Sequence, residues 1–181
     1  MKKVHISTPN KVLSGENVID DLCTEISSFG NKALIIIGQE SVKNNGLYPR
    51  VVSLMNIHGI KHFTYNHSST KATYQDADKV ISIAKEKNIE LIIALGDHLI
   101  WDLCKAISTG YFANHSVKEF YLQKVQPHKA LPLIGISTPQ ISDSHETERS
   151  YLYDVETGLK KNYTSPLNYP KISFFDSGFQ L

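Results

Sequence analysis

Side chains that could bind a metal ion gather at two places in the sequence. His58 and His62 are four residues apart, the spacing of two ligands on one face of a helix. Gly59 lies between them, however, and the pattern changes there from helical to strand-like, which argues against a shared face. Asp143–Glu146 holds three potential ligands within four residues, too close together for one ordinary site. Neither pattern predicts a metal centre.

The motifs of nucleophilic catalysis are missing from the sequence. No serine or cysteine stands in a pattern that would activate it with a neighbouring base. The two cysteines, Cys23 and Cys104, are far apart and have no partners at metal-ligand spacing. We therefore expect two reduced thiols packed in the interior, which favours a cytoplasmic location.

Composition narrows the class of protein. Apolar residues make up 41% of the 181 residues and charged residues 20%, and the formal net charge is +1. This balance is ordinary for a soluble domain and argues against a nucleic-acid partner, which would require basic residues gathered on one face. The first nine residues lack the apolar segment of a secretory signal, and no run approaches the roughly 20 apolar residues that span a bilayer. We expect one domain over residues 1–181, with no membrane partner.

Three short apolar runs bounded by turn residues could form the centre of a sheet. They are Lys32–Gly38, Glu90–Gly96 and Leu131–Ile136. Their apolar residues are continuous rather than alternating, which is typical of strands buried on both faces. The runs therefore predict parallel pairing.

Helical patterns lie between these runs. Apolar residues recur at three- and four-residue spacing in Val18–Ile26, Val51–Met55, Asp76–Asn88 and Trp101–Thr109, and Ile60–Tyr65 is strand-like. Strands and helices thus alternate with short connections. This order predicts an α/β fold in which helices cover both faces of a parallel sheet.

The C-terminal region has a different character. Serine, threonine, tyrosine, proline and charged residues dominate from Ser137 to Pro170. The strand-like pieces near it are Tyr151–Tyr153 and Ile172–Phe175. We interpret the region as a β-hairpin and loops that lie over the ligand-binding edge of the sheet.

Several segments follow the pattern of one known family in the same order along the chain. Pro9–Asn17 carries a proline, a lysine, an apolar pair and a Gly-Glu turn, and Gly30–Gly38 carries a buried strand. Ile92–Gly96 followed by Asp102–Ile107 frames a glycine turn, and Asp154–Lys161 reads Asp-x-Glu-Thr-Gly-x-Lys-Lys. The ordered set resembles the N-terminal half of the iron-containing alcohol dehydrogenases, which are related in fold to glycerol dehydrogenase and dehydroquinate synthase.

The resemblance implies a Rossmann-like nucleotide-binding domain with NAD or NADP as its cofactor. In the family, a helical domain that supplies one Asp and three His to the metal begins shortly beyond the position equivalent to Asp176. We therefore expect this chain to lack the family's C-terminal metal-binding domain and its metal ion, and to have no dehydrogenase activity alone.

The resemblance places the phosphate-binding turn at Gly96–Leu99. Backbone amides hold a pyrophosphate at such a turn, because the helix N-terminus is partly positive and glycines let the backbone approach. The family's second and third glycines are replaced by Asp97 and His98, and its serine by Leu99. Either a cationic His98 offsets the carboxylate in a rebuilt site, or the pocket is unused and Asp97 caps the next helix. Together, the negative charge of Asp97 and the loss of the serine hydroxyl at Leu99 should weaken cofactor binding substantially.

Four further residues fall on positions that the family uses around the nucleotide. Thr138 keeps a hydroxyl, whereas Pro139 removes the next one together with a backbone donor. Thr147 and Lys160 match contact positions without a gap, although a hairpin lysine is often a solvated charge. Gly38 stands where many relatives place an aspartate that binds the adenine-side ribose, so the choice between NAD and NADP stays open. Gly38 could equally well be an ordinary turn glycine.

Three functions remain open. The first is a truncated or degenerate dehydrogenase domain with residual NAD(P) binding or none. The second is one half of a split dehydrogenase, whose metal-binding domain lies on another chain and docks on an apolar surface. The third is a non-catalytic interaction module that pairs through its N-terminal strand with a second copy or a full-length relative.

Overall fold

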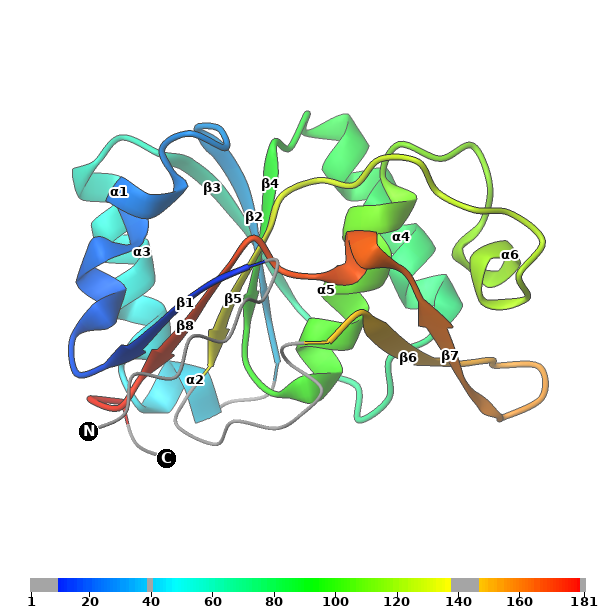
Figure 1. Ribbon diagram of the computed structural model, residues 1–181. Coiled ribbons are helices and arrows are strands. Elements are labelled where there is room, and N and C mark those ends of the chain that lie inside the picture. The colour runs from blue at the N-terminus through cyan, green and yellow to red at the C-terminus, as the bar shows by residue number, and fades with distance from the viewer. Residues whose placement is uncertain (1–9, 39–40, 138–146, 180–181) are drawn as a thin grey trace, which may run out of the picture.

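The structure is a computed structural model that describes residues 10–38, 41–137 and 147–179. Within these ranges a six-stranded sheet in the order β1-β8-β5-β4-β2-β3 lies between two layers of helices (Figure 1). All of its strand pairs are parallel. The six strands are β1 (Lys11–Gly15), β2 (Lys32–Ile37), β3 (Lys61–Asn66), β4 (Leu91–Leu95), β5 (Leu133–Ser137) and β8 (Ile172–Asp176). The predicted α/β class is confirmed.

The helices occupy the predicted segments, and three short helices, α2 (Ser41–Asn44), α6 (Val117–Tyr121) and η2 (Pro166–Asn168), are added to them. The helices in the predicted segments are η1 (Val18–Asp21), α1 (Leu22–Ile26), α3 (Leu47–Ile57), α4 (Tyr74–Glu86) and α5 (His98–Gly110). A capping box starts α4, because the Thr73 hydroxyl accepts from the Asp76 amide at 3.1 Å while the Asp76 carboxylate accepts from the Thr73 amide at 2.9 Å. Such caps contribute about 1 kcal/mol each.

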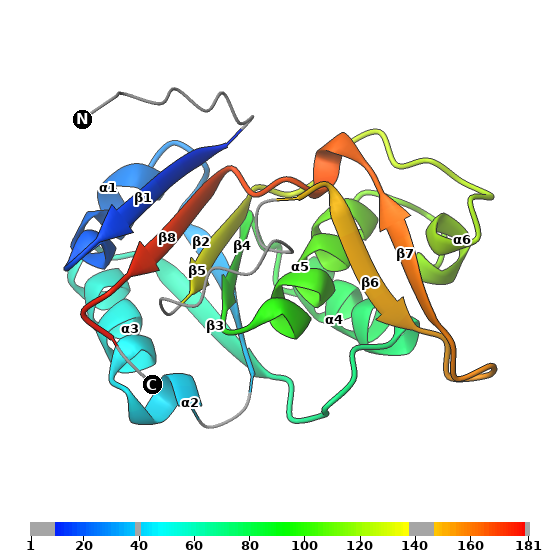
Figure 2. The same cartoon turned by 60° about the horizontal axis from the view of Figure 1, so that its bottom comes forward.

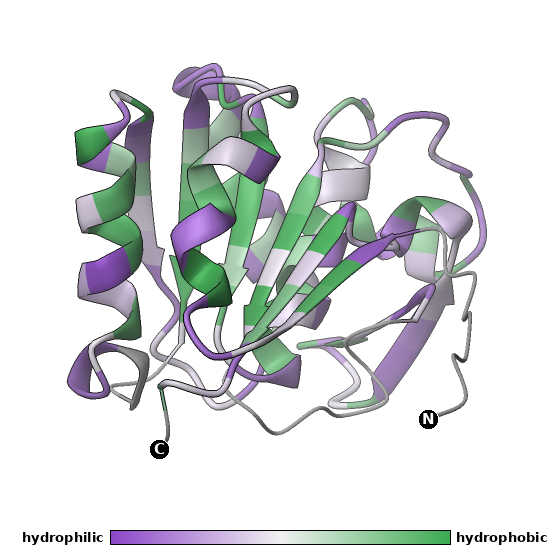
Figure 3. Ribbon diagram, turned by 60° about the vertical axis from the view of Figure 1, so that its left-hand side comes forward, coloured by the Kyte–Doolittle hydropathy of each residue, from purple (hydrophilic) through white to green (hydrophobic). Residues whose placement is uncertain are grey.

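The apolar strands feed two separate cores, one on each face of the sheet. Leu34 and Ile36 of β2 pack with α4, α5 and α6, whereas Ile35 and Ile37 pack with α1 and α3. Successive side chains of a strand point to opposite faces, so a continuous apolar run can supply both cores. Figure 3 shows the hydrophobic strands between helices whose outer sides are hydrophilic. Burying each of these side chains contributes roughly 1.5–3 kcal/mol.

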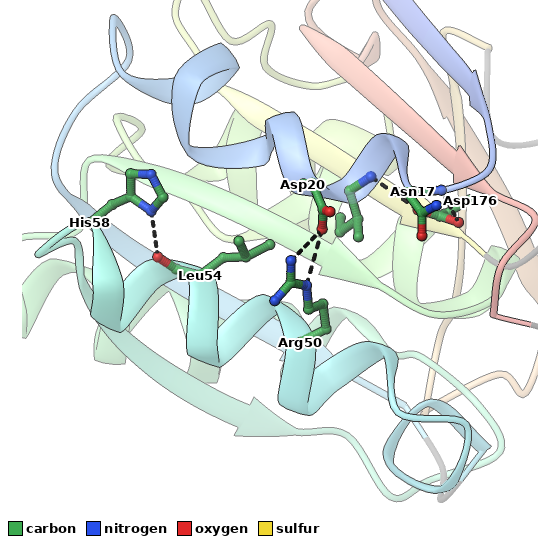
Figure 4. A network of polar contacts seen from close by, with 7 residues as sticks. Asn17, Asp20, Arg50, Leu54, His58 and Asp176 are labelled. Carbon is green, nitrogen blue, oxygen red and sulfur yellow. Dashed lines mark hydrogen bonds and ion pairs between the residues drawn. The ribbon is translucent and has the colours of Figure 1, made fainter.

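Polar contacts fasten the α1–α3 layer to the end of the sheet (Figure 4). The Asp176 carboxylate accepts from the amides of Asn17 at 3.1 Å and Ile19 at 3.0 Å. Arg50 of α3 donates to Asp20 of η1 at 2.7 Å. The Arg50–Asp20 pair is partly exposed, which limits it to under about 1 kcal/mol.

The C-terminal region corrects part of our interpretation. The predicted hairpin exists as β6 (Arg149–Tyr153) and β7 (Lys160–Thr164), an antiparallel pair outside the main sheet. It packs beside helices α4, α5 and α6 rather than across the edge of the sheet (Figure 2). The strand-like segment Ile172–Phe175 is confirmed as strand β8 (Ile172–Asp176), an inner strand of the main sheet that pairs with both β5 and β1. The sequence pattern missed this strand's place because only long-range pairing puts it beside β1.

The structure also bears on the predictions about the cysteines and about membrane-spanning segments. Cys23 and Cys104 are both buried free thiols, as predicted. In the described part of the chain, no helix has both the length and the apolar character needed to cross a membrane.

Candidate functional site

The order of the strands creates one preferred place for a ligand. The chain goes from β2 outward to β3, and then returns to place β4 on the other side of β2. Helix α3 covers one face of the sheet, while α4 and α5 cover the other. In open α/β sheets, ligands bind outside the carboxyl ends of the strands at such a reversal. Here that point is the edge where β2 and β4 end, the lower edge in Figure 1.

Two predicted site residues, Gly38 and Gly96, meet at this point. They directly follow β2 and β4, which are paired neighbours. A Cβ atom on Gly96 would lie 3.7 Å from the Gly38 nitrogen and 3.2 Å from Cγ1 of Ile100 in α5. A Cβ atom on Gly38 would lie 3.0 Å from the same Ile100 atom. Both glycines therefore let the two turns pack against the start of α5. This packing explains why a glycine is present at position 38 without reference to a nucleotide.

Asp97 and His98 begin the helix that points at this edge. Asp97 is the N-cap of α5, and its Oδ1 accepts from the amides of Leu99 at 3.1 Å and Ile100 at 3.4 Å. A bound phosphate would use amide donors of this kind. The Asp97 carboxylate therefore already holds the position of an anion at the helix N-terminus. Both Asp97 and His98 are exposed.

A buried carboxyl group lies behind this turn. Asp102 of α5 is 2% exposed, and its Oδ1 has no hydrogen-bond partner. Burial raises the pKa of Asp102 to about 7, although the charge of Lys105 and the amide of Tyr151 act in the opposite direction. The charges of Lys160 and Asp97 also act on its pKa. Asp102 thus lies within electrostatic range of both the turn and the hairpin.

Lys160 sits on an aromatic surface at the start of β7. Its Nζ lies 5.3 Å from the ring centre of Tyr151 and 5.8 Å from that of Tyr153. Lys71, which precedes α4, lies 5.1 Å from the ring centre of Tyr153. Cation–π contacts of this kind contribute about 0.5–1 kcal/mol at exposed sites. Lys160 is therefore an exposed cation with a preferred position, on the hairpin that packs against α5.

The other predicted residues are placed less closely. Thr147 is half-buried just before β6, where its Oγ1 accepts from the Arg149 amide at 3.4 Å. Thr138 and Asp143–Glu146 lie outside the described residues. The structure therefore brings Gly38, Gly96, Asp97 and His98 together at one edge of the sheet. Lys160 is linked to this edge only through the effect of its charge on the pKa of Asp102.

Trp101 is a structural residue of the site, although its sequence pattern indicates only ordinary helix packing. Its Nε1 donates to the Gly96 carbonyl oxygen at 3.1 Å, which fixes the turn from behind. A Cβ atom on Gly135 of β5 would lie 1.9 Å from Cη2 of the indole. Gly135 is thus required for the ring to lie on the sheet. The signal was a glycine inside an apolar strand, which often marks the close approach of another group.

The histidine pair does not form a shared site. His58 contacts the Leu54 carbonyl oxygen at 2.9 Å, whereas His62 contacts Asn56 Oδ1 at 3.1 Å. Among residues 10–38, 41–137 and 147–179, no three His, Cys, Asp or Glu side chains are grouped as metal ligands would be. We therefore derive no metal-dependent step from this chain.

Comparison with known proteins gives a consistent result. The family model described as iron-containing alcohol dehydrogenase matches residues 9–177. The chain is 29% identical over 168 residues to the probable NADH-dependent butanol dehydrogenase 1 of Bacillus subtilis, and 26% identical over 170 residues to NADH-dependent butanol dehydrogenase A of Clostridium acetobutylicum. These alignments cover 93% and 94% of this chain but 43% and 44% of the two relatives.

A solved structure agrees with the sequence relatives. The chain superposes with a TM-score of 0.88 and 25% identity on the NADH-dependent butanol dehydrogenase A of Thermotoga maritima, covering 97% of this chain and 44% of that one. The resemblance inferred from the sequence is confirmed. This chain spans less than half the length of the relatives that it matches.

Proposed function

The chain belongs to the iron-containing alcohol dehydrogenase family, and we propose that its residues form a weakened dinucleotide-binding domain of that family. The observation that carries this proposal is the position of Asp97. Its carboxylate accepts from two amides at the N-terminus of α5, at the edge where β2 and β4 end. A dinucleotide phosphate must displace this carboxylate and also approach its negative charge.

The remaining residues fit a dinucleotide in part. Gly38 and Gly96 carry no side chains at this edge. His98, whose imidazole is exposed, directly follows Asp97 in the sequence. Lys160 is an exposed cation on the hairpin that packs beside α5. When bound, a nicotinamide cofactor supplies hydride transfer. The residues of this chain would hold its phosphates and ribose, and we assign them no catalytic role.

Gly38 also bears on the choice of cofactor. In such folds an acidic side chain that reaches the adenine-side ribose favours NAD, because it binds the 2′-hydroxyl and repels a 2′-phosphate. Gly38, at the position where the family resemblance places an aspartate in many relatives, offers no carboxylate. The relatives named above are called NADH-dependent. We propose that this chain binds NADH and NADPH with similar, weak affinity.

Fluorescence titration with NADH and NADPH tests the proposal. We expect saturable binding with dissociation constants on the order of 1 mM, equal within about threefold for the two cofactors. Tight, selective binding of either one would contradict the weakened site. Flat titrations for both would contradict residual binding and favour a non-catalytic interaction module.

We further propose that redox chemistry needs a metal-binding domain contributed outside these residues. Such a domain could stand on the same chain or on another one, as in a split dehydrogenase. Mixing the chain with the separately expressed C-terminal half of a relative tests this proposal. Recovery of NADH-dependent aldehyde reduction by the mixture supports it, and activity of the 181-residue chain by itself would contradict it.

Strand β1 supports a second copy of this chain as the partner. It is the outermost strand of the main sheet and pairs with β8 on one side. The Lys11 amide donates toward β8, to the Lys171 carbonyl oxygen at 3.0 Å. Because successive amides of a strand alternate in direction, the Val12 amide points outward. We propose that two β1 edges pair in a homodimer.

A proline at the outward position tests the dimer. Val12→Pro removes an outward amide but leaves the ladder to β8, so we expect a monomer by light scattering where the unchanged chain is a dimer. Val12→Ala keeps the amide and serves as the control. A monomeric parent chain, or a dimeric Val12→Pro variant, would contradict pairing through β1.

A further inference from the structure

A cavity of about 280 Å³ lies at the opposite end of α5 from the candidate nucleotide site. Its walls come from the end of α5, from α6 and from the segment that leads to β5, at the upper right in Figure 1. The volume is near the lower end of the roughly 300–1,000 Å³ of small-molecule sites. The cavity is therefore large enough for a small organic molecule.

Hydrogen bonds from several elements hold these walls in place. Ser108 Oγ donates to the Leu131 carbonyl oxygen at 2.5 Å, and the Leu131 amide donates back to the Ser108 carbonyl oxygen at 3.0 Å. The Val117 amide, which starts α6, donates to Asp78 of α4 at 2.9 Å. Lys85 of α4 donates to the Ala113 carbonyl oxygen at 3.1 Å. The cavity is thus built into the folded domain, so little ordering would be needed on binding.

The lining combines an apolar body with basic groups. Phe112, Phe120 and Val125 line it together with His115, His128 and Lys129. None of the described residues that line it is an Asp or Glu. Lys129 is held in position, because its Nζ lies 4.3 Å from the ring centre of Phe112.

Two acidic groups lie near this set, because Asp78 accepts from the Val117 amide and Glu119 pairs with His115. His115 and Glu119 lie 3.2 Å apart, and both side chains are partly exposed. Lys129 and His128 remain as exposed basic groups of the lining. An apolar interior with a basic rim favours a ligand that has an apolar body and a negative end.

We propose that this cavity binds a small carboxylate with an apolar body, such as an aromatic or short aliphatic acid. The aromatic and aliphatic walls would contact the body of the ligand, and Lys129 and His128 would donate to its carboxylate. The proposal does not depend on nucleotide binding, because the cavity lies at the far end of α5 from Gly96.

Fluorine NMR with 4-fluorobenzoate as the probe tests this site. We expect saturable binding of the folded chain with a dissociation constant on the order of 1 mM. Lys129→Met keeps the apolar stem but removes the charge, and should weaken binding about tenfold. Lys87→Met is the matched control: its Nζ lies 4.6 Å from the ring centre of Phe63, and it does not line the cavity, so affinity should not change.

Three outcomes would overturn the proposal. They are an absence of saturation, equal affinity of the Lys129→Met variant, and equal affinity of the neutral 4-fluorobenzyl alcohol. Competition with NADH separates the two sites, since a probe displaced by NADH would lie at the nucleotide edge instead. Continued binding of the probe at an NADH concentration that saturates the nucleotide site supports the separate cavity. If NADH does not bind, the comparison of Lys129→Met with Lys87→Met decides between the two sites.

Discussion

Replacing Asp97 by glycine should strengthen dinucleotide binding. The substitution returns a glycine to the turn and frees the amides of Leu99 and Ile100, which now donate to the carboxylate at 3.1 and 3.4 Å. The 3.4 Å bond is at the long limit, so we count one full hydrogen bond to a phosphate. Such a bond to a charged group contributes about 2 kcal/mol, which corresponds to about 30-fold in the dissociation constant for NADH.

The same substitution should cost the fold little. Asp→Gly at an N-cap changes stability by a few tenths of a kcal/mol, so the melting temperature should fall by no more than about 2 °C. Fluorescence titration with NADH measures the gain in affinity. Asp97→Asn keeps an acceptor on the amides but removes the charge, and should give an intermediate affinity. Asp20→Asn, which removes an exposed carboxylate paired with Arg50 on the other face, is the control for net charge.

The order of affinities decides whether the reasoning holds. We predict that Asp97→Gly binds NADH most tightly, followed by Asp97→Asn, with Asp20→Asn equal to the unchanged chain. If Asp97→Gly binds NADH no better than the parent, the carboxylate does not compete with the phosphate. If Asp20→Asn gained as much affinity for NADH as Asp97→Gly, the effect would come from the net charge of the chain and not from the turn.

Two further predictions concern the structure behind the turn. Gly135→Ala should destabilise the fold by about 1–3 kcal/mol in urea unfolding, because its Cβ would lie 1.9 Å from Trp101 Cη2. The smaller ring in the double variant Gly135→Ala/Trp101→Phe should recover part of this loss. If the losses of the two single variants simply add in the double variant, the clash is refuted. Burial raises the pKa of Asp102 from 3.8 to about 7, so the folded state binds this proton more tightly than the unfolded state does. The contribution to stability is therefore fully present below pH 3.8 and is lost as the pH rises to about 7. Urea unfolding should therefore show Asp102→Asn losing less stability than the parent between pH 5 and pH 8, by up to roughly 3 kcal/mol. Identical pH profiles would show that Asp102 is not buried as described.

Much of the fold could be predicted because the sheet is buried on both faces. The apolar runs at Lys32–Gly38 and Glu90–Gly96 each became a strand, since a short continuous apolar run between turn residues is typical of a strand with both faces covered. Strand β1 and the position of β8 could not be placed in this way. Their pairing depends on contacts about 160 residues apart in sequence, such as that of Lys11 with Ile172, and no local pattern encodes such a partner.

The candidate site was predictable in position but not in detail. A strand-to-helix turn at Gly96 could be read directly, and so could the alternative role of Asp97 as a cap. The raised pKa of Asp102 could not, because it results from burial under β6, a strand 47 residues further along the chain. The position of Lys160 over Tyr151 likewise depends on the register of the hairpin.

Amide NMR spectra recorded during a titration with NADH test the central claim most directly. The claim is that the edge where β2 and β4 end still receives a dinucleotide. It predicts saturable shifts centred on the amides of Gly38, Gly96, His98 and Leu99, and larger ones in Asp97→Gly. Shifts that map elsewhere, or spectra of both proteins that stay unchanged at high NADH, would contradict it.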